Sequence, residues 1–384
     1  MSAKRQRLVR RRQAVGLTQE DLAGELGVER STVFRWESGQ TQPVPVQQPL
    51  LARLLDVSLA ELAELLLPEQ PSDPRLEHAQ RHPSSVDSAV VSDLQQRVCE
   101  LDDQYDHMPS TALLADTGRV LGHLRALARE PLGDSLQREL RTAEASAATL
   151  MGQLVWDSSQ RRDQRTAREY FRQAIQAARE NGDSVAEGHA ALRTSYLALY
   201  GDKDPVGGLC WTERAATVAC TSSDVLTGLA HLHSAEAHAM RGDANRCDAA
   251  LAAAETSFAR IAPSDPAAGA FSSSQFDRLA GSCSLFLGEY QQASRILGRA
   301  ATARTAASKS RAIVLGNLSL AYMHQRELEA ATHTLHEAMD VLETTRGGGG
   351  LTIVFDAGRK LGRWRTEPVV RDVHDRLLGL MTLA

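Results

Sequence analysis

The sequence lacks the features of an exported or membrane-spanning protein. Its 384 residues contain no run of about 18 apolar side chains, so no membrane-spanning helix is expected. The basic N-terminus is followed by no apolar stretch, and we therefore expect no secretory signal. The five cysteines lie far apart and form no C-x-x-C pair, which indicates reduced thiols buried in the fold. These absences predict a cytoplasmic protein.

Aromatic and β-branched side chains are also scarce, and this scarcity bears on the fold class. Aromatic residues make up only 4% of the chain, which is rich instead in Ala, Leu, Arg, Glu and Gln. This composition favours helix over sheet. Because 42% of the residues are hydrophobic, the chain can bury a substantial core, and its length indicates two or three domains. We predict an all-α protein.

The sequence contains no pattern typical of catalysis or of metal binding. Residues 281–284 fail the glycine spacing of a nucleophile elbow, and no strand precedes them. Residues 347–350 lack the Lys and Ser/Thr that follow a phosphate-binding loop. His231 and His238 share one helical face, but His233 does not, and no carboxylate or cysteine completes a ligand set. We predict no enzymatic activity, no metal and no cofactor.

Positive charge is concentrated near the N-terminus, although the net charge of the chain is −5. Residues 1–12 contain six basic side chains and no acidic one. Residues 1–66 contain nine basic and eight acidic side chains, so the remainder carries a net charge of −6. This division is typical of a small DNA-binding domain attached to a separate partner domain. A solvated, arginine-rich helix start is the alternative interpretation.

Helix start and stop signals predict five short helices in the N-terminal region. Their predicted ranges are 4–15, 19–26, 30–38, 46–55 and 59–67. Gly16, Gly27 and Gly39 end the first three. Two capping boxes begin helices: Thr18 pairs with Asp21, and Ser58 pairs with Glu61. Two of these helices, joined by a short turn containing glycine, form a helix-turn-helix.

The residues of this motif are specific enough to indicate a family. They are LTQEDLA at 17–23, GV at 27–28 and STVFRWESG at 31–39. This stretch resembles the phage-repressor-like (Cro/C1, or XRE) helix-turn-helix family over about the first 66 residues. The resemblance implies that the third helix enters the major groove of DNA, where each base pair displays its own pattern of donors and acceptors.

The resemblance also implies which residues contact DNA. Arg30, Ser31 and Arg35 occupy positions where relatives contact base edges, and Gln19 begins the helix that crosses the phosphates. Phe34 either contacts a thymine methyl group or packs on its own helix. The predicted set is Arg30, Ser31, Phe34, Arg35, Gln19, Gln40, Thr41, Arg10 and Arg11, of which the last four are expected at phosphates. Glu29 departs from the family pattern, because a neutral cap residue is usual at this position. An acidic side chain beside phosphates weakens binding unless it accepts from a cytosine amino group.

The rest of the chain predicts a proline-containing linker and a helical-repeat domain. Residues 68–91 are polar and contain four prolines. Beyond them, a spacing of small residue, large apolar residue and alanine recurs at intervals of about 40 residues. The copies are Ala167, Phe171 and Ala174; Gly208, Thr212 and Ala215; Cys247, Leu251 and Ala254; Ala293, Leu297 and Ala300; Ala331, Leu335 and Ala338. They resemble tetratricopeptide repeats over roughly residues 140–345, so we predict an α-solenoid and the domains 1–67, 68–91 and 92–384.

The whole chain thus resembles helix-turn-helix regulators with a C-terminal tetratricopeptide-repeat domain. Some of these relatives bind a short peptide in a groove lined by the first helix of each pair. The matching positions here are Trp156, Arg193, Tyr200, Glu236, Met240, Gln275, Arg278, Phe286, Asn317 and Met323. Of these, Arg193, Tyr200, Glu236, Gln275, Arg278 and Asn317 are the predicted ligand-binding residues. Residues 347–350 are expected to form a flexible break, and a final helix from Thr366 is expected to cap the solenoid or to form a dimer contact.

Two functions follow from these patterns. The first is a cytoplasmic, homodimeric, sequence-specific transcription regulator. It binds an inverted repeat in double-stranded DNA, and its repeat domain dimerises and senses a peptide, a small molecule or a protein partner. The second is a protein-interaction scaffold in which the helix-turn-helix does not read DNA. Arg30, Arg35 and the basic N-terminus favour the first, because a protein-binding module would not need them.

Overall fold

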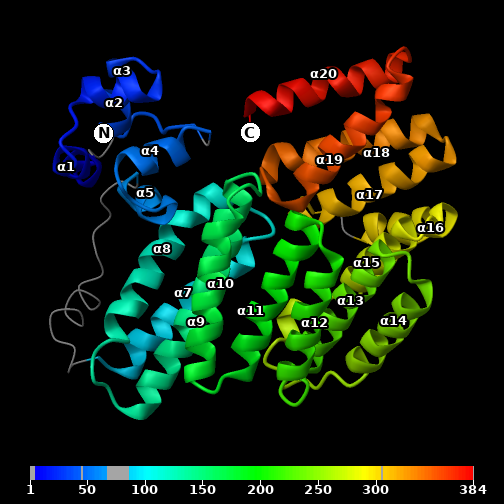
Figure 1. The fold of residues 1–384 in the computed structure, drawn as a ribbon, viewed down its shortest axis with the longest axis horizontal. Helices are drawn as coiled ribbons and strands as arrows, with labels where there is room; N and C mark the ends of the chain where they lie inside the picture. The colour runs from blue at the N-terminus through cyan, green and yellow to red at the C-terminus, as the bar shows by residue number, and fades with distance from the viewer. Residues whose placement is uncertain (1–4, 45, 67–85, 304–305, 384) are drawn as a thin grey trace. The chain divides into compact units, whose positions relative to one another are not determined.

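The computed structural model describes residues 5–44, 46–66, 86–303 and 306–383 (Figure 1). Over these ranges the regular structure is helical and contains no strand, which confirms the all-α fold class. The chain divides into two compact units. Unit 1 comprises residues 1–105 and 110–170, and unit 2 comprises residues 106–109 and 171–384. The predicted linker residues 68–85 lie outside the described ranges, and residues 88–91 already belong to a helix.

Unit 1 contains the helix-turn-helix and three longer helices, with the beginning of a fourth at its end. The N-terminal helices are α1 (Gln6–Ala14), α2 (Gln19–Leu26), α3 (Arg30–Glu37), α4 (Gln48–Leu54) and α5 (Leu59–Leu65). They are followed by α7 (Ser88–Gln104), α8 (Ser110–Leu127), α9 (Asp134–Ser158) and α10 (Gln164–Glu180), whose last residues belong to unit 2. The five N-terminal helices agree with the predicted ranges to within two residues at either end.

Local capping explains why the N-terminal helices begin and end where they do. The Thr18 hydroxyl accepts from the Asp21 backbone N–H at 3.1 Å, and the Thr18 N–H donates to the Asp21 carboxylate at 2.8 Å. Ser58 and Glu61 form the same reciprocal pair. Gly27 ends α2 in the left-handed conformation, at φ 66°, which glycine adopts without steric cost. Both predicted capping boxes are therefore confirmed.

A single apolar core holds the five N-terminal helices together. Its buried members are Leu8, Leu22, Ala23, Leu26, Val33, Trp36, Leu51, Ala52, Leu55, Leu62 and Leu66. Val33 and Trp36, which α3 contributes, lie one helical turn apart and therefore face the same way. Because this face of α3 is fixed in the core, the opposite face is turned to solvent.

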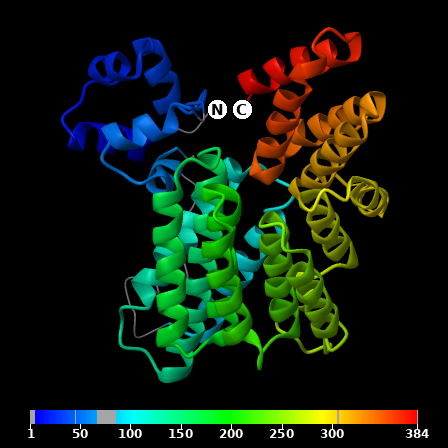
Figure 2. The same cartoon turned by 45° about the vertical axis from the view of Figure 1, so that its right-hand side comes forward.

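Unit 2 consists of successive helix pairs followed by two closing helices (Figures 1 and 2). The elements are α11 (Ser184–Tyr196), a π-helical segment (Leu197–Asp202), α12 (Pro205–Ala219), α13 (Asp224–Met240), α14 (Ala244–Phe258), α15 (Ser273–Phe286), α16 (Tyr290–Ala303), α17 (Lys309–Gln325), α18 (Leu328–Thr345), α19 (Gly348–Leu361) and α20 (Pro368–Leu383). Each helix from α11 to α18 packs against the next in its pair, and neighbouring pairs pack on one another.

The recurring small–large–alanine spacing lies on the second helix of each pair, namely α10, α12, α14, α16 and α18. Nearly all of its members are buried, and only Leu251 is half-buried. Small residues let two helix backbones approach closely, while the large side chain fills the space beyond them. The predicted helical-repeat arrangement is thus confirmed, and the same spacing that revealed it in the sequence forms the interfaces between helices.

Residues 347–350 are not the flexible break that we predicted. Gly348, Gly349 and Gly350 form the buried first turn of α19. A Cβ atom on Gly350 would lie 2.5 Å from the Cβ of Ala312 on α17, so only glycine fits. The run of glycines therefore permits close packing of two helices.

The final helix, α20, begins as predicted and packs its apolar stripe against its neighbours. Val370, Val373 and Leu377 are buried in the same core as residues of α18 and α19, whereas Val369 and Leu378 are exposed. Arg376 also forms ion pairs with Asp340 and Glu343 of α18. In unit 2, this side of α20 caps the repeats.

The cysteines divide between the interior and the surface. Cys247 and Cys283 are buried, but Cys99, Cys210 and Cys220 are exposed, so the expectation of buried thiols is wrong for these three. Across the described ranges, no helix combines the length with the apolarity that crossing a membrane requires.

Candidate functional site

Helix α3 presents four of the predicted DNA-binding residues on its solvent face. Arg30, Ser31, Phe34 and Arg35 are all exposed, and 55% of the Phe34 surface is accessible. An exposed phenylalanine between two exposed arginines is unusual on a solvated helix, because hydration of an aromatic ring is unfavourable. A single helix therefore presents two positively charged side chains, one hydroxyl group and one aromatic ring to solvent.

The two arginines of this face are held differently. The Arg35 guanidinium donates to the Ser31 carbonyl oxygen at 3.3 Å and to the Thr32 hydroxyl at 3.2 Å, so it lies along its own helix. The Arg30 side chain forms no hydrogen bond or ion pair with any residue in the described ranges. Arg30 is thus free to reorient toward a ligand, whereas Arg35 must exchange weak local bonds for new ones.

Glu29 is tied to this same face. The Ser31 hydroxyl donates to the Glu29 carboxylate at 3.0 Å, and Glu29 makes no side-chain cap at the start of α3. In the unbound protein, the Ser31 hydroxyl proton is therefore engaged by the exposed carboxylate of Glu29. Contact of Ser31 with a base edge requires this hydrogen bond to be exchanged.

Sequence reasoning missed a buried ionic network behind α3. Arg12 and Glu37 are both buried, and Arg12 Nε lies 2.6 Å from Glu37 Oε1. The Gln19 side-chain amide donates to the other Glu37 oxygen, also at 2.6 Å. Gln19, which begins the helix predicted to cross the phosphates, therefore helps to join α2 and α3, and Arg12 does not belong to an exposed basic arm. The only signal in the sequence was that Arg12 lies on the apolar face of its helix.

The remaining N-terminal arginines also divide between structure and surface. Arg5 is buried, which lowers the pKa of its guanidinium, and it donates to the carbonyl oxygens of Trp36 and Thr41 at 2.7 Å. Arg11 donates through Nε to the Leu55 carbonyl oxygen at 2.7 Å, and through Nη2 to Asp56.

Arg10, by contrast, is exposed, and its side chain has no hydrogen bond or ion pair in the described part of the chain. Lys4 lies outside the described ranges. Of the six basic residues at the N-terminus, Arg5, Arg11 and Arg12 are engaged in the fold. Of the two arginines predicted to contact phosphates, Arg11 is therefore engaged in the fold, and Arg10 has a side chain without a partner in the described ranges.

Gln40 and Thr41 lie in the turn after α3, and both side chains are exposed as predicted. Their backbone N–H groups donate to the Arg35 carbonyl oxygen, at 2.9 and 3.3 Å. Only their side chains therefore remain to donate to a phosphate.

The predicted ligand-binding residues of unit 2 converge at one place. Arg193 on α11, Glu236 on α13 and Arg278 on α15 act electrostatically on the side chains of Tyr196 and His233. Tyr200, on the π-helical segment, donates to Glu236. With the rings of Tyr196 and His233, they form what we term the tyrosine–arginine cluster. Its members are Arg193, Tyr196, Tyr200, His233, Glu236 and Arg278.

Hydrogen bonds fix the interior of this cluster. The Tyr200 hydroxyl donates to the Glu236 carboxylate and lies 2.7 Å from His233 Nδ1. Because the hydroxyl proton points to Glu236, His233 must donate its Nδ1–H to the Tyr200 oxygen. Burial and the neighbouring carboxylate raise the pKa of Tyr200 well above its usual value, and burial lowers the pKa of His233. Both groups are therefore uncharged near neutral pH.

The other matching positions are not members of this cluster. Asn317 is buried and donates to the Ser282 hydroxyl at 2.8 Å, so it joins α15 to α17. Met323 is also buried and Phe286 is exposed. Gln275, half-buried, lies one turn before Arg278 on α15. Trp156 belongs to unit 1, where it is buried.

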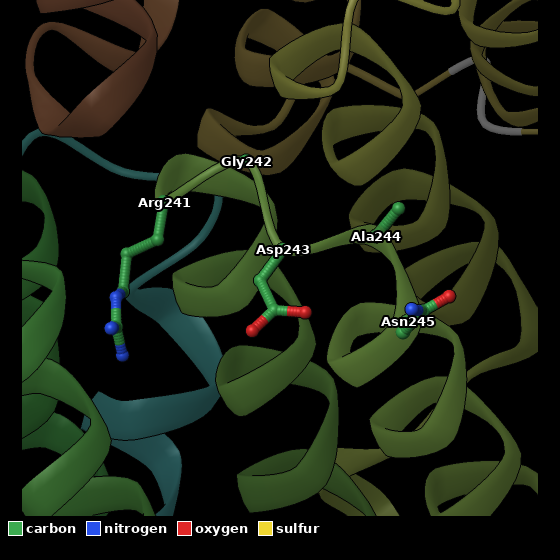
Figure 3. Close-up of a pocket in the computed structure, with 5 residues that line it drawn as sticks. All are labelled: Arg241, Gly242, Asp243, Ala244 and Asn245. Atoms are coloured by element: carbon green, nitrogen blue, oxygen red, sulfur yellow. The ribbon is translucent and has the colours of Figure 1, made fainter.

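Two other features carry no recognisable chemistry. A cavity of about 420 Å³ is lined by residues 241–245, from the turn between α13 and α14 and the first residues of α14 (Figure 3). Its acidic group, Asp243, caps α14 by accepting from the Arg246 N–H. The part of the chain that the structure describes brings together no set of three metal-ligating side chains.

Comparison with known proteins identifies the N-terminal module. Residues 5–65 match the family model described as a helix-turn-helix domain. These residues therefore form a helix-turn-helix domain, and the match supports a DNA-binding regulator in general. Among the curated proteins, none matches the chain.

Two solved structures match the chain at low identity. One is a chain of the APC/C hetero-tetramer Cut9–Hcn1, with 14% identity and a TM-score of 0.46; the match covers 98% of this chain and 64% of that one. The other is PlcR of Bacillus thuringiensis in complex with the peptide PapR7 and DNA, with 13% identity and a TM-score of 0.27; the match covers 88% and 94% of the two chains. This chain thus spans about two thirds of the first.

Proposed function

We propose that this protein is a sequence-specific DNA-binding transcription regulator that binds an inverted repeat as a homodimer. The observation that carries the proposal is the face of α3, where Arg30, Phe34 and Arg35 are exposed within a helix-turn-helix domain. A helix of this kind fits the major groove, and the groove is the surface of DNA on which all four base pairs differ.

Arg30 and Arg35 are the proposed base-reading residues. A guanidinium can donate two parallel hydrogen bonds to O6 and N7 of one guanine, which discriminates against other bases by roughly 1–3 kcal/mol. Phe34 is proposed to contact a thymine methyl group between them. Because the Arg30 side chain has no hydrogen bond or ion pair with any described residue, it can turn toward a base without exchanging one.

Phosphate contacts are proposed for Arg10 and for the side chains of Gln40 and Thr41. These contacts fix the position of α3 on the duplex and make binding depend on salt, because each neutralised phosphate releases counterions. Arg11 and Gln19 are assigned a supporting role, since their side chains already bond within the domain.

We further propose that the helical repeats dimerise the protein and bind an effector, either a peptide or a small molecule. A single recognition helix rarely holds one half-site tightly, so a second copy must be brought to the DNA. The half-buried members of the tyrosine–arginine cluster are the proposed effector contacts. We infer no catalytic role, and a regulator of genomic DNA would act in the cytoplasm.

The test begins with duplexes selected from a random pool by the purified full-length protein. Against the selected sequence, Arg30→Ala and Arg35→Ala are each expected to weaken binding by about tenfold and to relax preference at one base pair. Arg295→Ala, on the exposed face of α16, is the matched control and should bind as the parent does. If selection enriches no sequence, or if both α3 variants bind like the parent, the proposal is wrong and the scaffold hypothesis gains support.

A further inference from the structure

The residue at which α3 begins, Glu29, does not cap the helix with its side chain. Its backbone carbonyl oxygen accepts from the Thr32 N–H at 2.8 Å, so Glu29 is the N-cap residue, but its carboxylate bonds to none of the first N–H groups. Glutamate is not among the residues that stabilise this position, which are mainly Asn, Asp, Ser and Thr. Thr18 and Ser58, by contrast, cap α2 and α5 of the same domain. Helix stability therefore does not explain the side chain of Glu29.

The carboxylate of Glu29 lies instead along the exposed face of α3. It accepts from the Ser31 hydroxyl at 3.0 Å, and the Ser31 carbonyl oxygen accepts from the Arg35 guanidinium at 3.3 Å. Hydrogen bonds thus link Glu29, Ser31 and Arg35, which are all exposed. The carboxylate forms no ion pair with Arg30 or with any other residue in the described ranges. Because one hydroxyl donor uses only part of the acceptor capacity of a carboxylate, Glu29 can accept from a second donor.

The major groove contains few donors for such an acceptor. The N-terminal residues of a recognition helix contact base edges, so the second donor for Glu29 is sought on a base. Only cytosine N4 and adenine N6 donate in the major groove. Adenine also presents the acceptor N7 beside its amino group, and an acceptor repels a carboxylate, whereas cytosine presents no acceptor there. Guanine presents only acceptors, and thymine presents an acceptor and a methyl group. A carboxylate at this end of α3 therefore favours cytosine over the other three bases.

We propose that Glu29 reads a cytosine in each half-site by accepting from its N4 amino group, and that Ser31 positions the carboxylate. This inference rests on the proposed function and deepens it, because it adds an acceptor to a face on which Arg30 and Arg35 supply donors. Ser31 keeps its hydrogen bond to one carboxylate oxygen while the other oxygen accepts from the base. Since the negative charge also repels phosphates, Glu29 weakens binding to DNA that lacks the cytosine.

Selection from a random pool of duplexes by the full-length protein and by variants of Glu29 tests the proposal. The parent should enrich a cytosine at one position of each half-site, and replacing that base pair should weaken binding by about tenfold or more. Glu29→Gln should change the preference at this position from cytosine to adenine, because a carboxamide donates to N7 and accepts from the N6 amino group. Glu29→Ala should remove the preference at this position and raise the affinity for unselected DNA.

Glu25→Gln is the matched control. Glu25 is an exposed residue of α2, and the substitution removes the same charge. This variant should select the same sequence as the parent, whatever the general effect of the charge on affinity. Because none of the substituted side chains is buried, each variant should fold, and circular dichroism establishes that it does.

Variants of Ser31 distinguish positioning from direct reading. Ser31→Ala should weaken the preference for cytosine at the position that Glu29→Ala affects. In the Glu29→Ala background, the same change should have no further effect there, because the two residues act through one contact. A change of preference at a different base pair would mean that the Ser31 hydroxyl contacts a base itself, and it would contradict the positioning role.

The inference is overturned if Glu29→Gln and Glu29→Ala both select the parent sequence. Tighter binding of both variants to all DNA, with that preference unchanged, would mean that Glu29 acts only by repelling phosphates. In these cases the parent still selects a sequence, so the proposed function stands without the inference. A parent that selects no sequence would instead remove the proposed function, and the inference with it.

Discussion

At the scale of single residues, arginines of one short segment serve opposite purposes. Arg12 is buried against Glu37, while Arg10, two positions earlier, is exposed. A buried ion pair contributes little net stability, because removing both charges from water is costly. Loss of one partner is far more harmful, since it leaves the other charge buried and unpaired. The Arg12–Glu37 pair therefore fixes α3 in position and is sensitive to any change in either member.

We accordingly predict that Glu37→Gln destabilises the helix-turn-helix domain by about 3–5 kcal/mol. The neutral amide cannot balance the Arg12 guanidinium, which stays buried. Hydrogen exchange of the amides in residues 5–66, followed in the full-length protein, measures the local free energy of opening. Glu25→Gln, an exposed residue of α2, is the control and should change that free energy little. Equal exchange in the two variants would contradict a role for the network in stability.

Arg10 and Arg11 are predicted to respond differently to the same substitution. Arg10→Gln should weaken binding to all DNA sequences and lower the slope of log affinity against log salt by about 1, because one phosphate contact is lost. Arg11→Gln should leave that slope unchanged and lower the stability of the domain by about 1–3 kcal/mol, because Arg11 donates to the Leu55 carbonyl oxygen. Salt titrations and hydrogen exchange of both variants check this, and a lower slope for Arg11→Gln would place it at a phosphate.

The sequence predicted the exposed residues of α3 better than it predicted the arginines around them. Val33 and Trp36 are strongly apolar, so helical periodicity assigns them to the core and leaves Arg30 and Arg35 outside. An arginine carries no such signal, because its long apolar stem suits burial as well as exposure. Whether Arg12 is exposed or paired with Glu37 depends on how α1 packs against α3. The two residues are 25 positions apart in the sequence, so a local sequence pattern does not indicate the contact.

At the scale of elements, close helix packing in unit 2 depends on glycines within helices. A Cβ atom on Gly281 of α15 would lie 2.6 Å from Leu297 of α16, whereas one on Gly298 of α16 would meet no atom within 4 Å. Both glycines lie inside helices, where alanine is intrinsically favoured by about 1 kcal/mol. Alanine substitution at the two positions therefore distinguishes the effect of helix packing from that of helix propensity within one helix pair.

We predict that Gly281→Ala destabilises the repeats and that Gly298→Ala is neutral or stabilising. Crowding of Leu297 should cost about 1–3 kcal/mol, which exceeds the gain in helix propensity. Thermal unfolding of both variants, monitored by circular dichroism, gives the comparison. A higher melting temperature for Gly281→Ala than for the parent would show that α15 and α16 can separate without loss.

The elements of the repeats were predictable because one spacing recurs in five helices. Alanine and leucine at fixed intervals mark the buried face of each second helix, and repetition distinguishes them from chance. The run from Gly347 to Gly350 was mispredicted for a related reason. Glycine serves both as a flexible break and as a site of close approach, and only the neighbour, Ala312 on α17, decides between the two. The cluster around Tyr200 likewise depends on a π-helical segment that no sequence pattern indicated.

At the scale of the whole molecule, the proposed function requires two copies to be held in one orientation. The recognition helices of a two-fold dimer enter the major groove one helical turn apart, at a separation of about 34 Å. The chain offers the repeats as the means of dimerisation, and the exposed apolar residues Val369 and Leu378 remain on the surface of α20. If the two chains of the dimer are joined rigidly, the affinity for DNA depends on the spacing and relative rotation of the two half-sites on the duplex.

We predict that the full-length protein binds two half-sites at least about tenfold more tightly than one, because the second contact is made within a single complex. Inserting five base pairs between the half-sites should abolish this gain, since it turns one half-site by about half a helical turn away from its recognition helix. Sedimentation at the protein concentrations of the binding assay shows whether the unbound protein is dimeric. Retention of the full gain after the insertion would mean that the two DNA-binding domains are joined loosely. Equal affinity for one and for two half-sites would mean that the protein binds DNA as a monomer, and the repeats would then serve a function other than dimerisation.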